Sequence, residues 1–172
     1  DSDTIYGERN NDIVNGGNGD DTIYGTAFYM AAEQDIDTID GGSGNDWVDY
    51  RNISHAMTLT LNGATAATVS FGGTASDNAT YADTVVNIEN VRGGTGADNI
   101  TGDSGDNILD GWSGTDTLDG GGGNDTIVAR ATAGEVLNGG LGTDTLQLAQ
   151  NVDFRSITIS NLETLDIQNY YS

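Results

Sequence analysis

The sequence of 172 residues contains no cysteine and no proline, and it is poor in basic residues. Without cysteine, the chain can form neither a disulfide framework nor a thiolate metal site. Five Lys and Arg residues stand against 27 Asp and Glu residues, a formal net charge of -22 at pH 7. A compact body with this charge repels itself, so it needs bound cations or stays expanded. The same charge disfavours nucleic acid and anionic membranes as partners.

Other features that would identify common functional classes are also missing. No apolar run is long enough to span a membrane, and the chain begins without an initiator Met or a cleavable leader, so we interpret it as a fragment of a larger protein. The single histidine, His55, leaves no HExxH zinc site. The segment 41–45 (GGSGN) lacks the closing glycine of a nucleophile elbow. We therefore expect no enzymatic activity from this chain.

A unit of nine residues recurs along the chain. It begins at Gly7 (GERNNDIVN) and Gly16 (GGNGDDTIY), returns at Gly41 (GGSGNDWVD), and runs from Gly93 to Val128 without a gap. A last clear unit follows at Gly139 (GGLGTDTLQ), and partial units in the same register lie at 3–6 and 37–40. Self-similarity at a fixed short period is the signature of a solenoid, in which each unit stacks on its neighbours.

Three features are shared by the units. Glycine or another small residue stands at places one, two and four, a carboxylate or carboxamide at place six, and an aliphatic residue at place eight. The place-six residues of the full and partial units are Asp3, Asp12, Asp21, Asp37, Asp46, Asp98, Asn107, Asp116, Asp125 and Asp144. The place-eight residues of the full units are Val14, Ile23, Val48, Ile100, Leu109, Leu118, Ile127 and Leu146.

This pattern resembles the haemolysin-type repeats of the repeats-in-toxin (RTX) family, GGxGxDxUx with U aliphatic. The resemblance implies an all-β fold, a right-handed parallel β-roll or β-helix solenoid, with several Ca²⁺ ions as cofactors between stacked turns. It also implies that the place-six side chains and the carbonyls of the turn glycines hold the metal. Those glycines are Gly16, Gly17, Gly19, Gly41, Gly42, Gly44, Gly93, Gly94, Gly96, Gly102, Gly105, Gly111, Gly114, Gly120, Gly121, Gly123, Gly139, Gly140 and Gly142.

The chemistry of the residues agrees with this resemblance. Glycine can adopt positive φ and lets a tight turn direct its carbonyl oxygens toward one centre. An Asp at place six adds a charged oxygen, and oxygen is the ligand that Ca²⁺ takes, six to eight at a time. The last three places form a short strand whose middle side chain faces inward. A metal-free solenoid, in which Asp only caps its own turn, is the alternative. It would leave stacked carboxylates repelling one another.

Because two units make one full turn, every second unit should stack. Asp98 should therefore face Asp116 on one edge, Asn107 should face Asp125 on the other, and Asp3 should face Asp21. Two residues depart from the pattern: Asn107 offers a neutral oxygen, which should weaken its ion, and Trp112 stands where glycine is expected, which puts the shape of that turn in doubt.

Two segments interrupt the repeat. Residues 25–35 read as a tolerated loop extension that could include one helical turn. From Asp49 onward, period-two alternation predicts strands at 49–51, 57–61 and 67–71, with a turn at Asn62-Gly63 between the last two. Segment 88–91 (IENV) leads into the second repeat block, segment 162–165 (LETL) follows the last unit, and the two look like copies of one device. We predict two calcium β-roll modules, 1–92 with an inserted β segment and 93–172 with metal-free closing strands, that form one continuous solenoid.

The function that these features favour is a calcium-binding structural domain. Under the resemblance, the parent is a bacterial protein exported by type I secretion machinery, and the domain folds on calcium binding outside the cell. The alternative is a surface-layer or adhesin domain, in which calcium drives assembly and the further partners are other copies or a cell-surface glycan. The predicted location is therefore secreted or at the bacterial cell surface.

Overall fold

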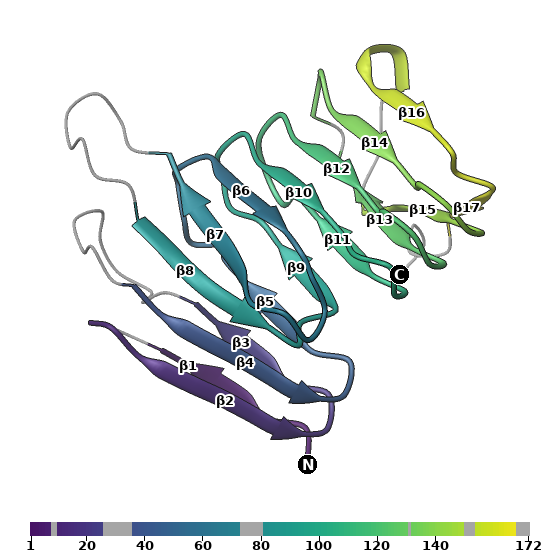
Figure 1. The fold of residues 1–172 in the computed structure, drawn as a ribbon. Coiled ribbons are helices and arrows are strands. Elements are labelled where there is room, and N and C mark those ends of the chain that lie inside the picture. Colours follow the sequence, from purple (N-terminus) through teal and green to yellow (C-terminus); the bar gives the residue numbers. More distant parts are fainter. Residues whose placement is uncertain (8–9, 26–35, 73–80, 131, 150–153, 168–172) are drawn as a thin grey trace.

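The computed structural model describes residues 1–7, 10–25, 36–72, 81–130, 132–149 and 154–167. Short strands account for nearly all of its regular structure and form two sheets that face each other (Figure 1). Except between β5 and β9, consecutive strands alternate between the sheets, so the chain winds as a flattened coil. The expected all-β roll is confirmed. The loop extension predicted at 25–35 lies almost entirely outside the described residues.

The first sheet has eight strands, all parallel. Their order is β1 (Thr4–Tyr6), β3 (Thr22–Tyr24), β5 (Trp47–Asp49), β9 (Asn90–Arg92), β11 (Ile108–Asp110), β13 (Thr126–Ala129), β15 (Thr145–Leu148) and β17 (Thr164–Asp166). The register joins equivalent places of successive coils, as in Ile108 with Thr126. Each strand is three or four residues long because only places seven to nine of a unit are extended.

The second sheet has nine strands. Their order is β16 (Thr158–Ser160), β14 (Val136–Asn138), β12 (Thr117–Asp119), β10 (Asn99–Thr101), β6 (Met57–Thr60), β7 (Ala67–Phe71), β8 (Tyr81–Val86), β4 (Thr38–Ser43) and β2 (Ile13–Asn18). All neighbours are parallel except β7, which is antiparallel to both β6 and β8. A single 3-10 helix, η1 (Phe154–Ser156), precedes β16 among the described residues, and none of these residues lies in a helix that could cross a membrane.

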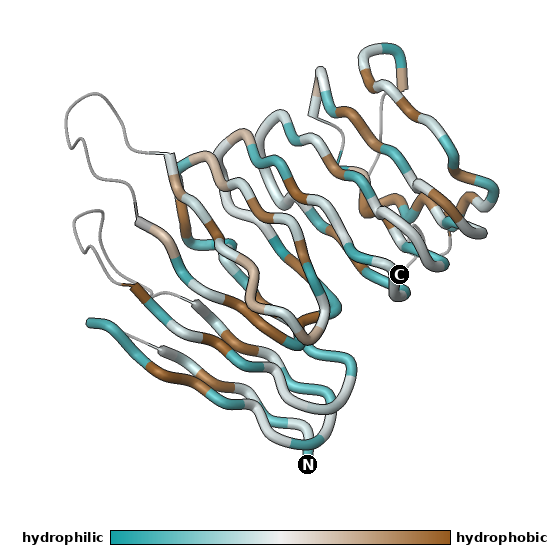
Figure 2. The backbone as a smooth tube through the Cα atoms, viewed as in Figure 1, coloured by the Kyte–Doolittle hydropathy of each residue, from teal (hydrophilic) through white to brown (hydrophobic). Residues whose placement is uncertain are grey.

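The core lies between the sheets and is built from the place-eight side chains. Ile23, Val48, Ile100, Leu109 and Ile127 are fully buried, and Leu118 and Leu146 nearly so. Figure 2 shows apolar segments recurring on the strands of both sheets between more polar neighbours. Burying one such side chain contributes roughly 1.5–3 kcal/mol. These aliphatic residues form one narrow layer between the two sheets, so the turns need stabilisation of their own.

The interruption after β5 widens the second sheet. Strands β6, β7 and β8 stand between β4 and β10, whereas β5 and β9 are direct neighbours in the first sheet. The predicted strands at 57–61 and 67–71 and the intervening turn are confirmed as an antiparallel pair. The predicted strand at 49–51 is wrong beyond Asp49, because Tyr50 leaves the sheet to enter the core. There it is fully buried, with its ring 5.2 Å from that of Phe71.

Candidate metal centre

The place-six residues form two rows along the edges of the roll. We call the turns that lead into the first sheet edge 1 and those that lead into the second sheet edge 2. Edge 1 carries Asp3, Asp21, Asp46, Asn107, Asp125 and Asp144, and edge 2 carries Asp12, Asp37, Asp98 and Asp116. The predicted stacking of Asp98 on Asp116, Asn107 on Asp125 and Asp3 on Asp21 is confirmed by the strand register.

Within each row, the turns are joined by a carboxylate ladder. One oxygen of a place-six carboxylate, Oδ1, accepts the backbone N–H of the place-six residue one coil earlier. The distances on edge 1 are 2.7 Å for Asp3 to Asp21, 2.8 Å for Asp21 to Asp46, 2.8 Å for Asn107 to Asp125 and 2.7 Å for Asp125 to Asp144. Edge 2 repeats the contact from Asp12 to Asp37 and from Asp98 to Asp116, both at 2.9 Å.

The second carboxylate oxygen, Oδ2, is left over in several of the place-six residues. Among the described residues, it is buried without a hydrogen-bond partner in Asp12, Asp21, Asp46, Asp125 and Asp144. A buried charged oxygen with no partner is costly, because it has lost its water and gained nothing in exchange. One such oxygen could reflect local imperfection, but a row of them at equivalent positions indicates a shared cation ligand.

The glycine at place one leaves room for that cation. A Cβ atom added to Gly16 would overlap both Asp21 Oδ2 and the carbonyl oxygen of Gly41 in the next turn of the same edge. A place-six side-chain oxygen and a carbonyl oxygen crowd the equivalent point at five further glycines, and at Gly102 the side-chain oxygen is the amide oxygen of Asn107. The five are Gly41, Gly93, Gly102, Gly120 and Gly139. At these six positions, a side chain would therefore fill the space between the place-six side chain and a backbone carbonyl of the next turn.

The glycines at places two and four shape the turn instead. Positive φ occurs at Gly17, Gly19, Gly42, Gly44, Gly114, Gly121, Gly123, Gly140 and Gly142. Trp112 takes the same left-handed conformation, with φ of 65°, where Gly121 has 91°. The turn is kept, since the Ser113 N–H still donates to the Gly94 carbonyl at 3.0 Å. Gly94 and Gly96, predicted as metal-binding turn glycines, lie at the start of the second repeat block. They face the 53–55 segment and not another glycine turn.

Burial also makes these carboxylates hard to ionise. It raises the pKa of Asp98 to about 6, that of Asp116 to about 7 and that of Asp125 to about 6. For Asp116, the charge of Asp98 adds to this effect, and for Asp125 the charge of Asp144 does. The fold thus holds carboxylates in places where, near neutral pH, they need either a proton or a cation.

Hard oxygen ligands suit a calcium ion. Within the described ranges, no three His, Cys, Asp or Glu side chains come together, so each site would draw mainly on backbone carbonyls with one or two carboxylates. Calcium accepts such mixed oxygen sets, whereas magnesium demands near-ideal octahedral geometry and zinc prefers nitrogen and sulfur. The residues present therefore fit Ca²⁺.

Three rungs are satisfied without a cation. Asp98 Oδ2 accepts the N–H of Gly94 in its own turn at 2.8 Å. The side chain of Asn107 accepts from the Asp103 N–H and donates to the Glu89 carbonyl, at 2.9 and 2.8 Å. Asp83, on edge 2, accepts the hydroxyl of the buried Tyr50 at 3.0 Å. The weaker ion expected at Asn107 stays a prediction, and its amide already has partners on both sides.

Three glutamates of the two rows lie outside the nonapeptide pattern, and a fourth member, Asp83, begins a segment (Asp83-Thr84-Val85) that resembles places six to eight of a unit. Strand register puts Glu89 and Glu163 at place six of edge 1, and Asp83 and Glu135 at place six of edge 2. The three glutamates stand immediately before a strand with a central aliphatic residue, whereas Asp83 lies within β8. The similarity of segments 88–91 and 162–165 is the other signal in the sequence. The turns of the four residues lack the glycines, and three of the four are Glu rather than Asp.

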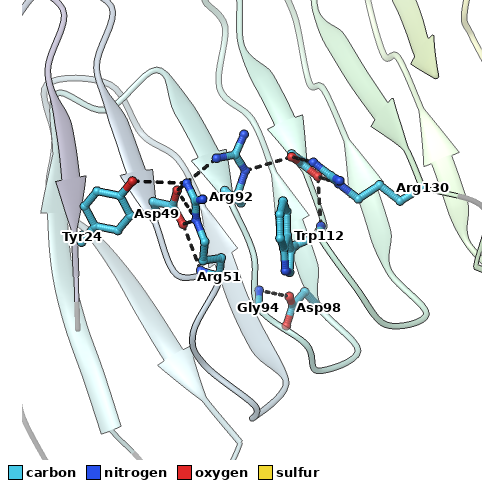
Figure 3. A network of polar contacts seen from close by, with 9 residues as sticks. Tyr24, Asp49, Arg51, Arg92, Gly94, Asp98, Trp112 and Arg130 are labelled. Carbon is cyan, nitrogen blue, oxygen red and sulfur yellow. Dashed lines mark hydrogen bonds and ion pairs between the residues drawn. The ribbon is translucent and has the colours of Figure 1, made fainter. Parts of the chain in front are cut away.

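A separate network joins the two repeat blocks on the outer face of the first sheet (Figure 3). Arg92 on β9 contacts Asp49 on β5 and Asp110 on β11, at 3.1 and 2.9 Å. Arg130 adds a second pair to Asp110 at 2.6 Å, and Arg51 binds Asp49. Burial would raise the pKa of Asp110, but Arg130 and Arg92 outweigh it and lower that pKa. This junction needs no metal.

The two tryptophans belong to this network. The ring of Trp112 lies 4.2 Å from the guanidinium carbon of Arg130, and Arg51 and Arg92 lie within 5.5 Å of it. Trp47 packs against Arg92 at 5.1 Å. Guanidinium groups over aromatic faces contribute roughly 0.5–2 kcal/mol each. Such contacts offset the strain of a left-handed tryptophan.

Comparison with known families identifies the repeat. The model of the RTX calcium-binding nonapeptide repeat matches four copies, over residues 1–28, 30–51 and 92–127, together half of the chain. The chain belongs to the RTX calcium-binding repeat family. RTX repeats bind Ca²⁺, and proteins that carry them are typically exported. A search of curated proteins found no match. Which atoms of this RTX chain hold each ion stays a prediction, and Asp144, Glu89, Glu135 and Glu163 lie outside the matched ranges.

Proposed function

We propose that this chain is a calcium-driven folding module of an exported bacterial protein, with a structural rather than a catalytic role. The observation that carries the proposal is the row of buried carboxylate oxygens, Oδ2 of Asp21, Asp46, Asp125 and Asp144, which lack any hydrogen-bond partner. Each of them lies beside a place-one glycine and the carbonyl of the next turn. Calcium supplies the missing partner, and the turns become stable only when it is bound.

The balance of free energies supports a folding switch. Ordering a backbone costs roughly 1–2 kcal/mol per residue, and the 26 glycines raise that cost. The narrow aliphatic core offsets only part of it. An ion that binds only the folded state adds RT ln(1 + [L]/Kd), about 2.7 kcal/mol when calcium is at a hundred times Kd. Several ions together can decide whether the chain folds.

Such a switch suits export in the unfolded state by type I secretion machinery. Extracellular calcium modules bind with Kd of roughly 10⁻⁴–10⁻³ M, well above cytosolic calcium levels. The chain would stay expanded inside the cell and fold after it leaves. The net charge of -22 favours the expanded state whenever calcium is scarce.

Small-angle X-ray scattering tests this proposal. An unfolded chain of 172 residues has a radius of gyration of about 44 Å, and a compact one of this length about 16 Å, somewhat more for an elongated roll. We expect the larger value in EDTA and collapse on addition of millimolar Ca²⁺, but no collapse with the same concentration of Mg²⁺. An equally compact chain in EDTA and in calcium would contradict the proposal.

A second candidate function is assembly at the cell surface, as in a surface-layer or adhesin domain. Apolar side chains on the last strands favour it, since Ile159 and Leu165 are 39% and 55% exposed at the edge of the described sheets. Assembly predicts that scattered light intensity rises with calcium at constant protein concentration. A calcium-loaded chain that sediments as a monomer at high concentration would exclude assembly by this chain alone.

A further inference from the structure

Two five-residue segments outside the matched repeats occupy equivalent positions on edge 1, each directly after the last glycine turn of a repeat block. Residues 87–91 (NIENV) follow the Asp46 turn, and residues 161–165 (NLETL) follow the Asp144 turn. Each consists of an Asn, an aliphatic residue, a Glu, one variable residue and a second aliphatic residue. Each continues the first sheet, in β9 and β17 respectively. We call these segments the Asn-Glu caps.

The backbone of the first residue is the same in both caps. Asn87 and Asn161 have φ of 52° and 49°, in the left-handed region that residues other than glycine rarely adopt. Their side chains are held alike, since Nδ2 donates to Asp40 at 2.8 Å in one cap and to Asn138 at 2.7 Å in the other. This conformation directs the carbonyl oxygens of the two Asn residues at Gly41 and Gly139.

The glutamate takes over the role of the place-six Asp. Glu89 Oε2 accepts the N–H of Asp46 at 2.8 Å, and Glu163 Oε2 accepts the N–H of Asp144 at the same distance. The turn of each cap is shorter than the six-residue glycine turn of a repeat, and the extra methylene of Glu lets its carboxylate reach the ladder from this shorter turn. Edge 1 thus consists of two ladders, each of four place-six residues joined by three hydrogen bonds, and each ladder ends in a Glu.

The Asp carboxylate that faces each cap has a buried oxygen without a hydrogen-bond partner. Asp46 and Asp144 are both fully buried, and the Oδ2 atom of each lacks a hydrogen-bond partner. A Cβ added to the place-one glycine of either turn would lie 2.8 Å from Asp46 Oδ2, or 2.7 Å from Asp144 Oδ2, and would overlap the cap carbonyl. The space that a cation would enter is therefore bounded on one side by the repeat and on the other by the cap.

We propose that each Asn-Glu cap completes a calcium site, in which the Asn carbonyl and the Glu carboxylate replace the carbonyl and the Asp of a missing next repeat. Asp46 with Asn87 and Glu89 forms one site, and Asp144 with Asn161 and Glu163 forms the other. The caps thus end the metal ladder without leaving its last carboxylate unpaired. This inference rests on the proposed function, because it takes calcium as the ligand of the repeats.

Ion counting with charge-neutral variants tests the proposal. Glu163→Gln keeps an acceptor for the Asp144 N–H but removes the charge. Asp166→Asn, at the end of the β17 strand that follows Glu163, removes the same charge away from the site. Native mass spectrometry and isothermal titration calorimetry with Ca²⁺ should show one ion fewer for Glu163→Gln, or one Kd raised roughly 10–100-fold. The double variant Glu89→Gln/Glu163→Gln should lose two ions, and Asp166→Asn should lose none.

A second pair of variants tests the carbonyl. Asn161→Gly keeps the left-handed conformation and should keep the ion, whereas Asn161→Val opposes that conformation and should lose it. Unchanged ion counts and Kd values in Glu163→Gln and Asn161→Val would overturn the cap proposal while leaving the repeats as calcium sites. A parent chain that binds no calcium at all would instead overturn the proposed function.

Discussion

Substitution of Asp125 by Asn removes one charge from a proposed calcium site with little other disturbance. Asp125 is 1% exposed, and its Oδ1 accepts the Asn107 N–H at 2.8 Å, a contact that an Asn carbonyl oxygen can keep. Its Oδ2, which has no partner, becomes a neutral amide. If the ion is lost at calcium a hundredfold above Kd, stability falls by about 2.7 kcal/mol. For a domain of this size, that corresponds to a Tm lower by about 5–11 °C.

The sign of the effect should change when calcium is removed. Burial and the charge of Asp144 raise the pKa of Asp125 to about 6, so at pH 7.5 the carboxylate is charged in a place that disfavours charge. Asparagine relieves this repulsion. In EDTA the variant should therefore hold at least as much β-structure as the parent chain. Loss of stability in calcium together with no loss in EDTA distinguishes a metal ligand from a residue that only caps its turn.

Thermal unfolding followed by circular dichroism, in 5 mM Ca²⁺ and in EDTA, measures both effects. The matched control is Asp106→Asn, on the same edge, where an exposed carboxylate accepts the Asn124 N–H at 2.6 Å. The control removes the same charge but should change Tm by less than about 2 °C, in line with an exposed surface substitution. Equal losses for the two variants in calcium, or an equal loss for Asp125→Asn in both buffers, would refute this reasoning.

Three further outcomes are expected. In EDTA, acidification from pH 8 to 5 should increase the β-signal in circular dichroism. Carboxyls whose folded pKa is about 6 or 7 stabilise the fold fully below their unfolded pKa of about 4, and this contribution is lost as pH rises through 6–7. A decrease of the β-signal on acidification would contradict this. Gly120→Ala should abolish one ion by calorimetry, since its Cβ would overlap Asp125 Oδ2 and the next carbonyl, whereas Gly122→Ala, with no atom within 3.5 Å of its Cβ position, should keep it. Arg92→Gln should lower the free energy of unfolding by about 1.5–3 kcal/mol in urea titrations, because it removes one of the two guanidinium partners of each buried carboxylate, Asp49 and Asp110. The loss should not depend on calcium, and a loss no larger than that of Arg155→Gln would count against it.

The repeats could be predicted from the sequence because their determinants are local. A strand of three residues with one inward side chain fixes which residue is buried, and the period of nine fixes which units stack. The register of β10 with β12 and of β11 with β13 follows directly. The place-six carboxylates fall on two edges for the same reason.

The caps and the junction could not be predicted, because they depend on contacts between distant residues. Glu89 joins the ladder only because the inserted strands β6 to β8 return the chain beside Asp46, 43 positions earlier. The role of Arg92 likewise requires Asp49 and Asp110 to lie on adjacent strands of one sheet. No period marks these positions. Similarity between segments 88–91 and 162–165 was the sole hint that they share a role.

The central claim is that calcium, and not the polypeptide alone, makes this fold stable. Far-UV circular dichroism during a Ca²⁺ titration of the EDTA-treated chain at pH 7.5, with Mg²⁺ as the control, tests it most directly. We expect a coil spectrum at the start and a cooperative change to β-structure that only Ca²⁺ produces. A β-spectrum that is already present in EDTA and does not change with Ca²⁺ would contradict the account.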